Sequence, residues 1–284
     1  YAEFLNAVDP NGTNPRGVYS LSMGGTSALG GINFSSGAST GAKYSVKAGA
    51  PSGAPAGTSY GQMPVNFVTW FSAARFVNWL NNGQPSGTSA AASMEIGAYT
   101  LNSATSGNIV ARNANAQVFL PSVNEWYKAA YYSGSNSTYT LYATNSNAVP
   151  TASVTNVTLT NAANYNSVMT SPRNVGSFVN TTSAYGLFDM LGNVTEMTDN
   201  TDLAASTSVR GMGGPWTGLA SGWNSKSTAV NFLGSSPAQN LGFRVAAVPE
   251  PGTIALAGLG IESLFGLDWM KRRKKRQVES REIA

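Results

Sequence analysis

The chain of 284 residues contains neither cysteine nor histidine. The lack of cysteine excludes disulfides, thiolate nucleophiles and zinc sites built on sulfur, and the lack of histidine removes the usual general base and the commonest ligand of transition metals. Zinc enzymes and Ser-His-Asp hydrolases are therefore excluded. A hard cation bound by oxygen atoms alone is still compatible with the residues present.

Charged residues are also scarce, at 11% of the chain against roughly 25% in ordinary soluble domains. Six of the 17 basic residues lie in one run at 271–276, so the net charge of +4 belongs largely to the tail. No basic patch with interleaved aromatics precedes that run, and we expect no nucleic-acid binding. The abundant glycine, serine, threonine and asparagine favour an exported, loop-rich protein with a polar, weakly charged surface.

Hydrophobic residues make up 42% of the chain, enough for a core, and their spacing predicts several helices. Residues 1–8 have the pattern of an amphipathic helix. Thr69 is the predicted N-cap of a helix that ends before Gly83. Ser122 and Glu125 form the S-x-x-E pattern of a capping box, which predicts the start of another helix.

Strand signals are short and weak by comparison. We predict short strands at 17–21 and 43–46, and irregular structure with further short strands over 133–182, which is rich in serine, threonine and asparagine. The chain begins at Tyr1, within a helical pattern and without an initiator methionine or a leader, so we expect a fragment that lacks N-terminal residues.

Two carboxylates, Asp189 and Glu196, lie seven residues apart around a turn that contains Gly192. Calcium takes about six to eight oxygen ligands, and a loop bent at glycine allows alternate carbonyl groups to point inward. The spacing is therefore compatible with a calcium site. The alternative is that both residues are ordinary capping or surface carboxylates.

Several segments occur in an order that resembles the formylglycine-generating enzyme (sulfatase-modifying factor) family across residues 1–247. These segments are Pro64-Val65 with Trp70, Asn78-Trp79-Leu80, Leu120-Pro121-Ser122 with Glu125-Trp126, the turn at 186–196, Arg210-Gly211, Gly213-Gly214-Pro215-Trp216 and Asn240-Leu241-Gly242-Phe243-Arg244. The resemblance implies a domain over 1–248 with an α+β, C-type-lectin-like fold of small sheets, few helices and much coil.

The resemblance also implies calcium as a cofactor. In that family a side chain, two main-chain carbonyls and a closing glutamate hold the ion, and the matching positions are Asp189, Gly192, Val194 and Glu196. A second calcium site of the family begins at an asparagine that matches Asn164, although residues 166–173 lack the carboxylate expected there.

The family's two reactive cysteines, five residues apart, correspond here to Gly218 and Trp223. Neither side chain forms a thiolate or binds copper(I), so we expect no copper and no oxidation of a sulfatase cysteine. In lectin-like folds this region forms the variable ligand face, and we predict that Trp216, Trp223 and Asn224 bind a glycan, peptide or protein. The alternative is that both tryptophans are core residues.

We therefore predict an exported, non-catalytic, lectin-like module. Two alternatives stay open: a divergent enzyme on the same scaffold, in which carboxylates such as Glu196 act with a metal, and a structural matrix protein. Arg210, which precedes Gly211, and Arg244, two residues after Gly242, are predicted to serve as internal clamps.

The tail over 249–284 has three parts. Pro249, Glu250 and Pro251 precede an apolar segment at 254–270 and then the basic run, an order that resembles the PEP-CTERM sorting signal of Gram-negative bacteria. That resemblance implies recognition and processing by exosortase-type machinery. The apolar segment is short and contains acidic residues, which predicts only a transient inner-membrane anchor before processing. We expect the protein at the cell surface, on the outer membrane or in the extracellular matrix.

Overall fold

The computed structural model describes residues 1–25, 27–153, 158–199, 206–225 and 229–248. The chain divides into two compact units, Tyr1–Ala246 and Ala247–Ala284, of which the second is almost entirely outside the described residues. The predicted sorting signal at Pro249, Glu250 and Pro251 and the apolar segment after it lie outside the described residues. Within the described ranges, no helix has both the length and the apolar character needed to cross a membrane.

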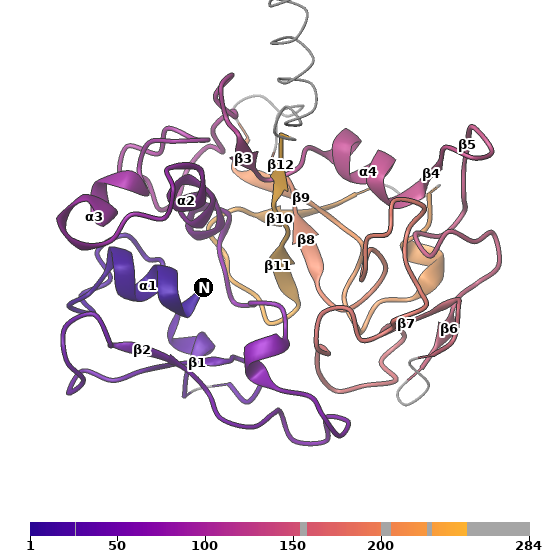
Figure 1. Ribbon diagram of the computed structural model, residues 1–284, viewed down its shortest axis with the longest axis horizontal. Coiled ribbons are helices and arrows are strands. Elements are labelled where there is room, and N and C mark those ends of the chain that lie inside the picture. Colours follow the sequence, from indigo (N-terminus) through magenta and orange to yellow (C-terminus); the bar gives the residue numbers. More distant parts are fainter. Residues whose placement is uncertain (26, 154–157, 200–205, 226–228, 249–284) are drawn as a thin grey trace, which may run out of the picture. The chain divides into compact units, whose positions relative to one another are not determined.

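Helices in the first unit are few and short (Figure 1). The α-helices are α1 (Ala2–Val8), α2 (Trp70–Asn81), α3 (Ala90–Ser93) and α4 (Val123–Tyr131), and the 3-10 helices are η1 (Leu21–Met23), η2 (Tyr60–Gln62), η3 (Gly87–Ser89) and η4 (Ala220–Gly222). The predicted helices at 1–8, after Thr69 and after Ser122 are confirmed as α1, α2 and α4.

Reciprocal side-chain caps fix where α2 and α4 begin. The hydroxyl of Thr69 accepts a hydrogen bond from the N–H of Ser72 at 3.0 Å, and the hydroxyl of Ser72 accepts one from the N–H of Thr69 at 2.9 Å. In the same way, Ser122 accepts from the N–H of Glu125 at 3.2 Å, and the Glu125 carboxylate accepts from the N–H of Ser122 at 2.7 Å. Each cap satisfies backbone donors that a helix start leaves unpaired.

The strands form small sheets. A four-stranded sheet has the order β10-β9-β8-β11, in which β8 pairs in parallel with β11 and the other pairs are antiparallel. Its strands are β8 (Thr195–Met197), β9 (Ser208–Met212), β10 (Val230–Leu233) and β11 (Leu241–Phe243). The two-stranded pairs are β1 (Ile32–Phe34) with β2 (Tyr44–Val46), β4 (Tyr132–Ser133) with β5 (Thr138–Tyr139), and β6 (Thr151–Ala152) with β7 (Ala162–Ala163). The remaining short strands are β3 (Val118–Phe119) and β12 (Ala246–Ala247).

The predicted strand at 43–46 is confirmed as β2, whereas the strand predicted at 17–21 is wrong. The side chain of Asn14 accepts a hydrogen bond from the N–H of Tyr19 at 3.1 Å and donates one to its carbonyl at 2.7 Å. These are the two backbone groups through which a strand would pair with a neighbour. The side chain of Asn14 therefore replaces a strand partner at this point, and η1 follows directly.

Two apolar clusters lie on either side of the four-stranded sheet. The first surrounds α1 and α2 and includes Val209 of β9, and the second surrounds α4 and includes Met212 of the same strand. Residues an odd number of positions apart on a strand point to opposite faces, so β9 supplies both clusters. Figure 1 shows the sheet between the α1–α3 side and the α4, β4–β7 side. The α+β class is confirmed, with small sheets, few helices and much coil.

Candidate functional site

The central feature of the candidate site is a buried ion pair between adjacent parallel strands. Glu196 of β8 lies opposite Gly242 of β11, and Arg244 directly follows β11. Nε and Nη2 of Arg244 donate to Oε2 and Oε1 of Glu196, each at 2.6 Å. Nε1 of Trp126, on α4, donates to Oε2 of the same carboxylate at 2.6 Å. Glu196 is only 6% exposed, so these bonds compensate for its removal from water.

Asp189 belongs to the same group of charges. It lies in the turn before β8 with φ of 56°, and its carboxylate accepts a hydrogen bond from the N–H of Gly176 at 2.7 Å. Burial raises the pKa of Asp189, and the charge of Glu196 raises it further, against the opposing effects of Gly176, Arg244 and Arg173. Burial lowers the pKa of Arg244, but the two carboxylates outweigh it and hold that pKa above its usual range. The turn therefore does bring both predicted acidic residues together, around an arginine.

The fit of a calcium ion to this turn depends on Arg244. The predicted ligands are Asp189, Gly192, Val194 and Glu196. Both oxygens of Glu196 already accept hydrogen bonds, so a cation bound there would have to share the carboxylate with Arg244 or displace it. Among the described residues, no group of three or more acidic, histidine or cysteine side chains is placed to hold a metal. As arranged, Arg244 supplies the positive charge at Glu196, and calcium at this turn stays a prediction.

Asn164, the residue predicted to begin a second calcium site, directly follows β7 and is buried. Its Nδ2 donates to the carbonyl of Ser171 at 3.2 Å, and its own carbonyl accepts from the N–H of Asn193 at 2.9 Å. A Cβ atom on Gly192 would lie 2.2 Å from that carbonyl oxygen, which requires glycine there. Asn164 therefore packs against the turn that contains Gly192, and its predicted calcium role is untested by this arrangement.

One indole ring occupies the region that matches the reactive cysteines. Trp223 stands at one of the two positions, and its ring lies against the other, Gly218. A Cβ atom on Gly218 would lie 2.5 Å from Nε1 of Trp223, and one on Gly214 would lie 2.4 Å from Cγ of the same ring. Such distances are far below van der Waals contact. Any side chain at either glycine would therefore collide with the indole of Trp223 where it now lies.

The predicted ligand-binding residues differ in exposure. Trp216 is 1% exposed and lies in the interior, which agrees with the alternative of a core residue and leaves its ring out of reach of a ligand. Trp223 is half-buried against the second cluster, and its carbonyl accepts from the hydroxyl of Tyr131 at 3.3 Å. Asn224 is also half-buried and donates to the carbonyl of Ser221 at 3.0 Å.

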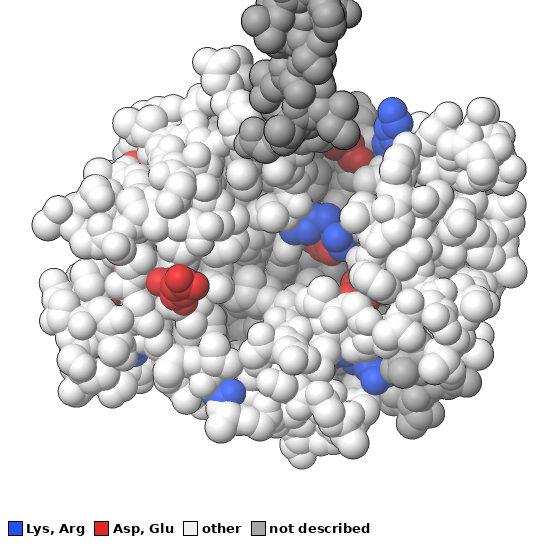
Figure 2. Space-filling view, viewed as in Figure 1, with Lys and Arg blue, Asp and Glu red and all other residues white. Residues whose placement is uncertain are grey.

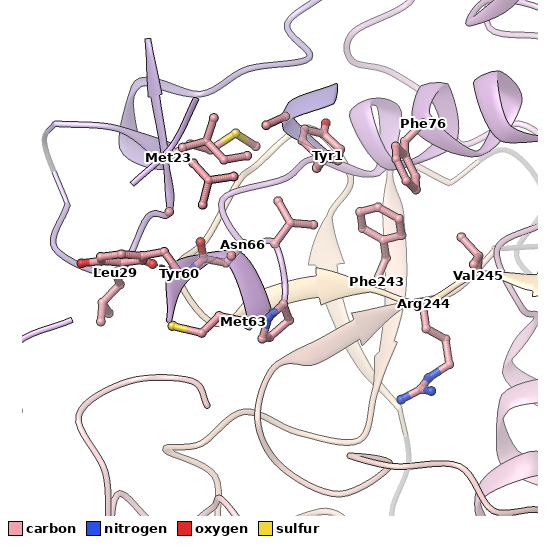
Figure 3. Close-up of a pocket in the computed structure, with 17 residues that line it drawn as sticks. Tyr1, Met23, Leu29, Tyr60, Met63, Asn66, Phe76, Phe243, Arg244 and Val245 are labelled. Atoms are coloured by element: carbon pink, nitrogen blue, oxygen red, sulfur yellow. Dashed lines mark hydrogen bonds between the residues drawn. The ribbon is translucent and has the colours of Figure 1, made fainter. Parts of the chain in front are cut away.

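A pocket of about 350 Å³ that the sequence did not predict lies beside Arg244 (Figure 3). Its walls come from α1, from the segments around β1 and η2, from α2 and from β11, which lie far apart in the sequence. Figure 2, viewed as in Figure 1, shows a hollow with basic and acidic side chains inside it and a mostly uncharged surface around it. No local motif marks these residues, because their apolar side chains resemble those of any core.

Comparisons with known protein families agree with the family resemblance that the order of segments in the sequence indicated. The model of the sulfatase-modifying factor enzyme 1-like domain matches residues 2–248, and that of the PEP-CTERM protein-sorting motif matches residues 247–275. No curated protein matches the chain.

Solved structures similar to part of the chain include the following two. Treponema denticola variable protein 1 has 23% identity and a TM-score of 0.49 over 69% of this chain and 75% of that chain. CarF has 21% identity and a TM-score of 0.45 over 66% of this chain and 69% of that chain.

The sorting motif implies an exported protein that exosortase machinery recognises. The domain match extends over most of the chain and includes the turn, the glycine-rich segment and the ion pair described above. The chain therefore belongs to the sulfatase-modifying factor enzyme 1-like family, with a PEP-CTERM motif after the domain.

Proposed function

We propose that this protein is a non-catalytic binding module that recognises a glycan, a peptide or a protein at the cell surface or in the extracellular matrix. The PEP-CTERM motif supports the exported location. In this proposal the tail anchors the chain only transiently in the inner membrane, before exosortase processing near Pro249, Glu250 and Pro251.

The observation that carries the proposal is the ring of Trp223 over Gly214 and Gly218. The chemistry associated with the family's reactive cysteines needs thiolates, and the chain contains no cysteine. At the matching positions, one residue lacks a side chain and the other fills the space with an indole. The lack of cysteine and this packing support a scaffold that serves for recognition.

The surface that we propose for recognition is the loop over 217–225. Leu219 is 61% exposed, and Thr217, Ser221 and Gly222 are exposed around the half-buried Trp223. The loop is held against α4, because the hydroxyl of Tyr127 donates to the carbonyl of Ser225 at 2.8 Å. An anchored loop with one exposed apolar side chain, polar neighbours and the edge of an indole has the features of a small recognition surface.

A glycan and peptide array probed with the full chain tests this proposal. We expect binding to at least one ligand class, and we expect Leu219→Ala to weaken it because that side chain is the most exposed apolar group of the loop. Val179→Ala is the matched control, since Val179 is similarly exposed but lies outside the loop. If both variants bound the array equally well, the loop over 217–225 would not be the recognition surface. An array without any binding would contradict the binding function itself.

The catalytic alternative is tested beside the array with a sulfatase-derived peptide that contains the target cysteine. We expect no formylglycine product, because no thiolate is available to attack or exchange with the substrate. Product formation above that of a heat-denatured sample would overturn the non-catalytic proposal.

A further inference from the structure

The pocket beside Arg244 is a second candidate site, separate from the loop over 217–225. Its volume of about 350 Å³ lies within the range of small-molecule sites, roughly 300–1,000 Å³. Most lining side chains are apolar, among them Met23, Leu29, Ile32, Met63 and Val65. A site with so few polar groups is poorly suited to a sugar, whose hydroxyls would lose their hydrogen bonds to water.

One wall of the pocket is aromatic. The ring of Phe76 lies 5.4 Å from that of Tyr1 and 5.5 Å from that of Phe243, and the rings of Tyr1 and Phe243 are 6.3 Å apart. Figure 3 shows the rings of Tyr1, Phe76 and Phe243 close together, and Phe76 and Phe243 meet edge to face. Aromatic rings arranged in this way present both faces and edges, which favours contact with another flat or aromatic body.

The walls are held in place by hydrogen bonds and strands. The side-chain amide of Asn66 donates to the carbonyls of Leu29 and Gln239, at 3.2 Å and 2.8 Å. Ile32 and Val46 are paired across β1 and β2. These contacts join segments that are distant in the sequence, so the pocket is formed before any ligand enters.

Among the described residues that line the pocket, Arg244 has the only charged side chain. Glu196 accepts from its Nε and Nη2, the carbonyl of Phe188 also accepts from Nη2 at 3.1 Å, and no described residue accepts a hydrogen bond from its Nη1. The side chain is 25% exposed. Figure 3 shows Arg244 at the end of the pocket away from Met23 and Leu29, so the guanidinium with its remaining N–H donors lies at the edge of an otherwise apolar pocket.

We propose that this pocket binds a free small molecule with an aromatic body and one terminal oxygen acceptor, a carboxylate or an amide carbonyl, which receives a hydrogen bond from Arg244. The aromatic body lies against Tyr1, Phe76 and Phe243. The acceptor group lies at the Arg244 end. There it accepts a further hydrogen bond from the guanidinium, which is already paired with Glu196. This activity is independent of the proposed recognition by the loop over 217–225.

Ligand-observed NMR with the full chain tests the ligand class through three probes of the same shape: 3-phenylpropionate, 3-phenylpropanamide and 3-phenylpropylamine. We expect the first two to bind and the amine to bind at least about tenfold more weakly, because its ammonium would face the guanidinium without an acceptor oxygen. Equal binding of the amine, or no binding of any probe, would overturn the proposal. Arg244 itself is left intact, since its loss would also expose Glu196.

The location is tested by filling the pocket. Val46 lines it and is 48% exposed, so Val46→Trp is expected to fold and to lower probe affinity by at least about tenfold. Val179→Trp, at a position 56% exposed and outside the pocket, is the control and should bind within about twofold of the unaltered chain. If Val46→Trp unfolds, Val245→Trp at the Arg244 end replaces it.

Unchanged affinity in a folded pocket-filling variant would place the site elsewhere and contradict the inference. Failure of the inference is distinguishable from failure of the proposed loop function, because Leu219→Ala changes only the array result. Val46→Trp changes only the binding of the small probes.

Discussion

Arg244 holds Glu196 through two hydrogen bonds of 2.6 Å, and this pair connects the end of β11 to the middle of β8. The indole of Trp126 binds the same carboxylate from α4. One buried acid therefore joins a helix to two parallel strands. The same contact fixes the guanidinium that lines the pocket, so the stability of the sheet and the chemistry of the pocket depend on one side chain.

Arg244→Met is expected to destabilise the protein by about 3–5 kcal/mol, because it leaves the buried carboxylate of Glu196 without its counter-ion. Urea unfolding followed by tryptophan fluorescence measures the loss. The double variant Arg244→Met with Glu196→Gln should recover part of it, since the uncompensated charge is then gone. If the losses of the two single variants simply added in the double variant, Arg244 and Glu196 would not be energetically coupled.

Arg16→Met provides the control for a surface ion pair. Arg16 lies 3.4 Å from Glu95 and its side chain is more than one-third exposed. Water and salt screen such a pair, so the expected loss is below about 1 kcal/mol. A loss as large as that of Arg244→Met would show that burial does not distinguish the two arginines.

Gly214→Ala is expected to cost more than about 2 kcal/mol for two separate reasons. Gly214 has φ of 75°, which an L-residue adopts at a cost of roughly 1–2 kcal/mol, and its Cβ would collide with Trp223. In a Trp223→Ala background the collision is removed and only the backbone cost remains. Thermal unfolding of the four proteins in this cycle gives both contributions.

Gly222→Ala is the matched control for this cycle. A Cβ there meets nothing within 4 Å, so a change of less than about 0.5 kcal/mol is expected. If Gly214→Ala were as well tolerated as Gly222→Ala, the indole could not occupy the space assigned to it.

The sequence predicted the features that depend on local contacts. The caps of α2 and α4 are made by residues three positions apart, as the Ser122–Glu125 pattern indicated. The α+β class followed from the order of many short motifs. The turn at Asp189 and Glu196 was predicted as a place where two acids meet, and it does bring them together.

The partner of Glu196 was not predicted, because it lies 48 residues away and pairs through a parallel strand register that no sequence period reveals. Trp126 is 70 residues from the same carboxylate. Trp216 was predicted to reach a ligand, but its burial depends on how the whole loop packs. The pocket was missed for the same reason, since its walls meet only in the folded domain.

The Glu125 carboxylate provides a prediction about pH. Partial burial alone would raise its pKa, but the Arg112 guanidinium and the N–H of Ser122 outweigh that effect and hold the pKa below its usual range. The resulting stability is present above the ordinary glutamate pKa of about 4.3 and is lost as pH falls through the lower, folded-state pKa.

Glu125→Gln preserves a capping box while removing the charge. We expect it to lower the unfolding free energy by about 0.2–1 kcal/mol at neutral pH, because the side chain is 44% exposed and solvent screens its ion pair. The difference from the unaltered chain should shrink below about pH 4. Chemical denaturation across this range measures it, and a difference that stayed constant with pH would contradict the ionic origin.

Calcium provides the last test, because the sequence predicts a site at Asp189 and Glu196 where the structure places Arg244. If the guanidinium is the resident cation, the melting temperature in about 1 mM Ca²⁺ should equal that in excess chelator, even though extracellular sites bind calcium at roughly 0.1–1 mM. This is the outcome we expect, since both oxygens of Glu196 are already engaged.

A rise in melting temperature with calcium would instead support the sequence-based prediction, and Asp189→Asn decides whether it comes from this turn. Asparagine tolerates the positive φ of this position and retains an oxygen for the N–H of Gly176, so the variant should fold. It removes one of the two negative charges that a calcium ion would need. A calcium-dependent rise that disappears in Asp189→Asn would place the ion at this turn, whereas a rise that persists would place the ion elsewhere in the chain.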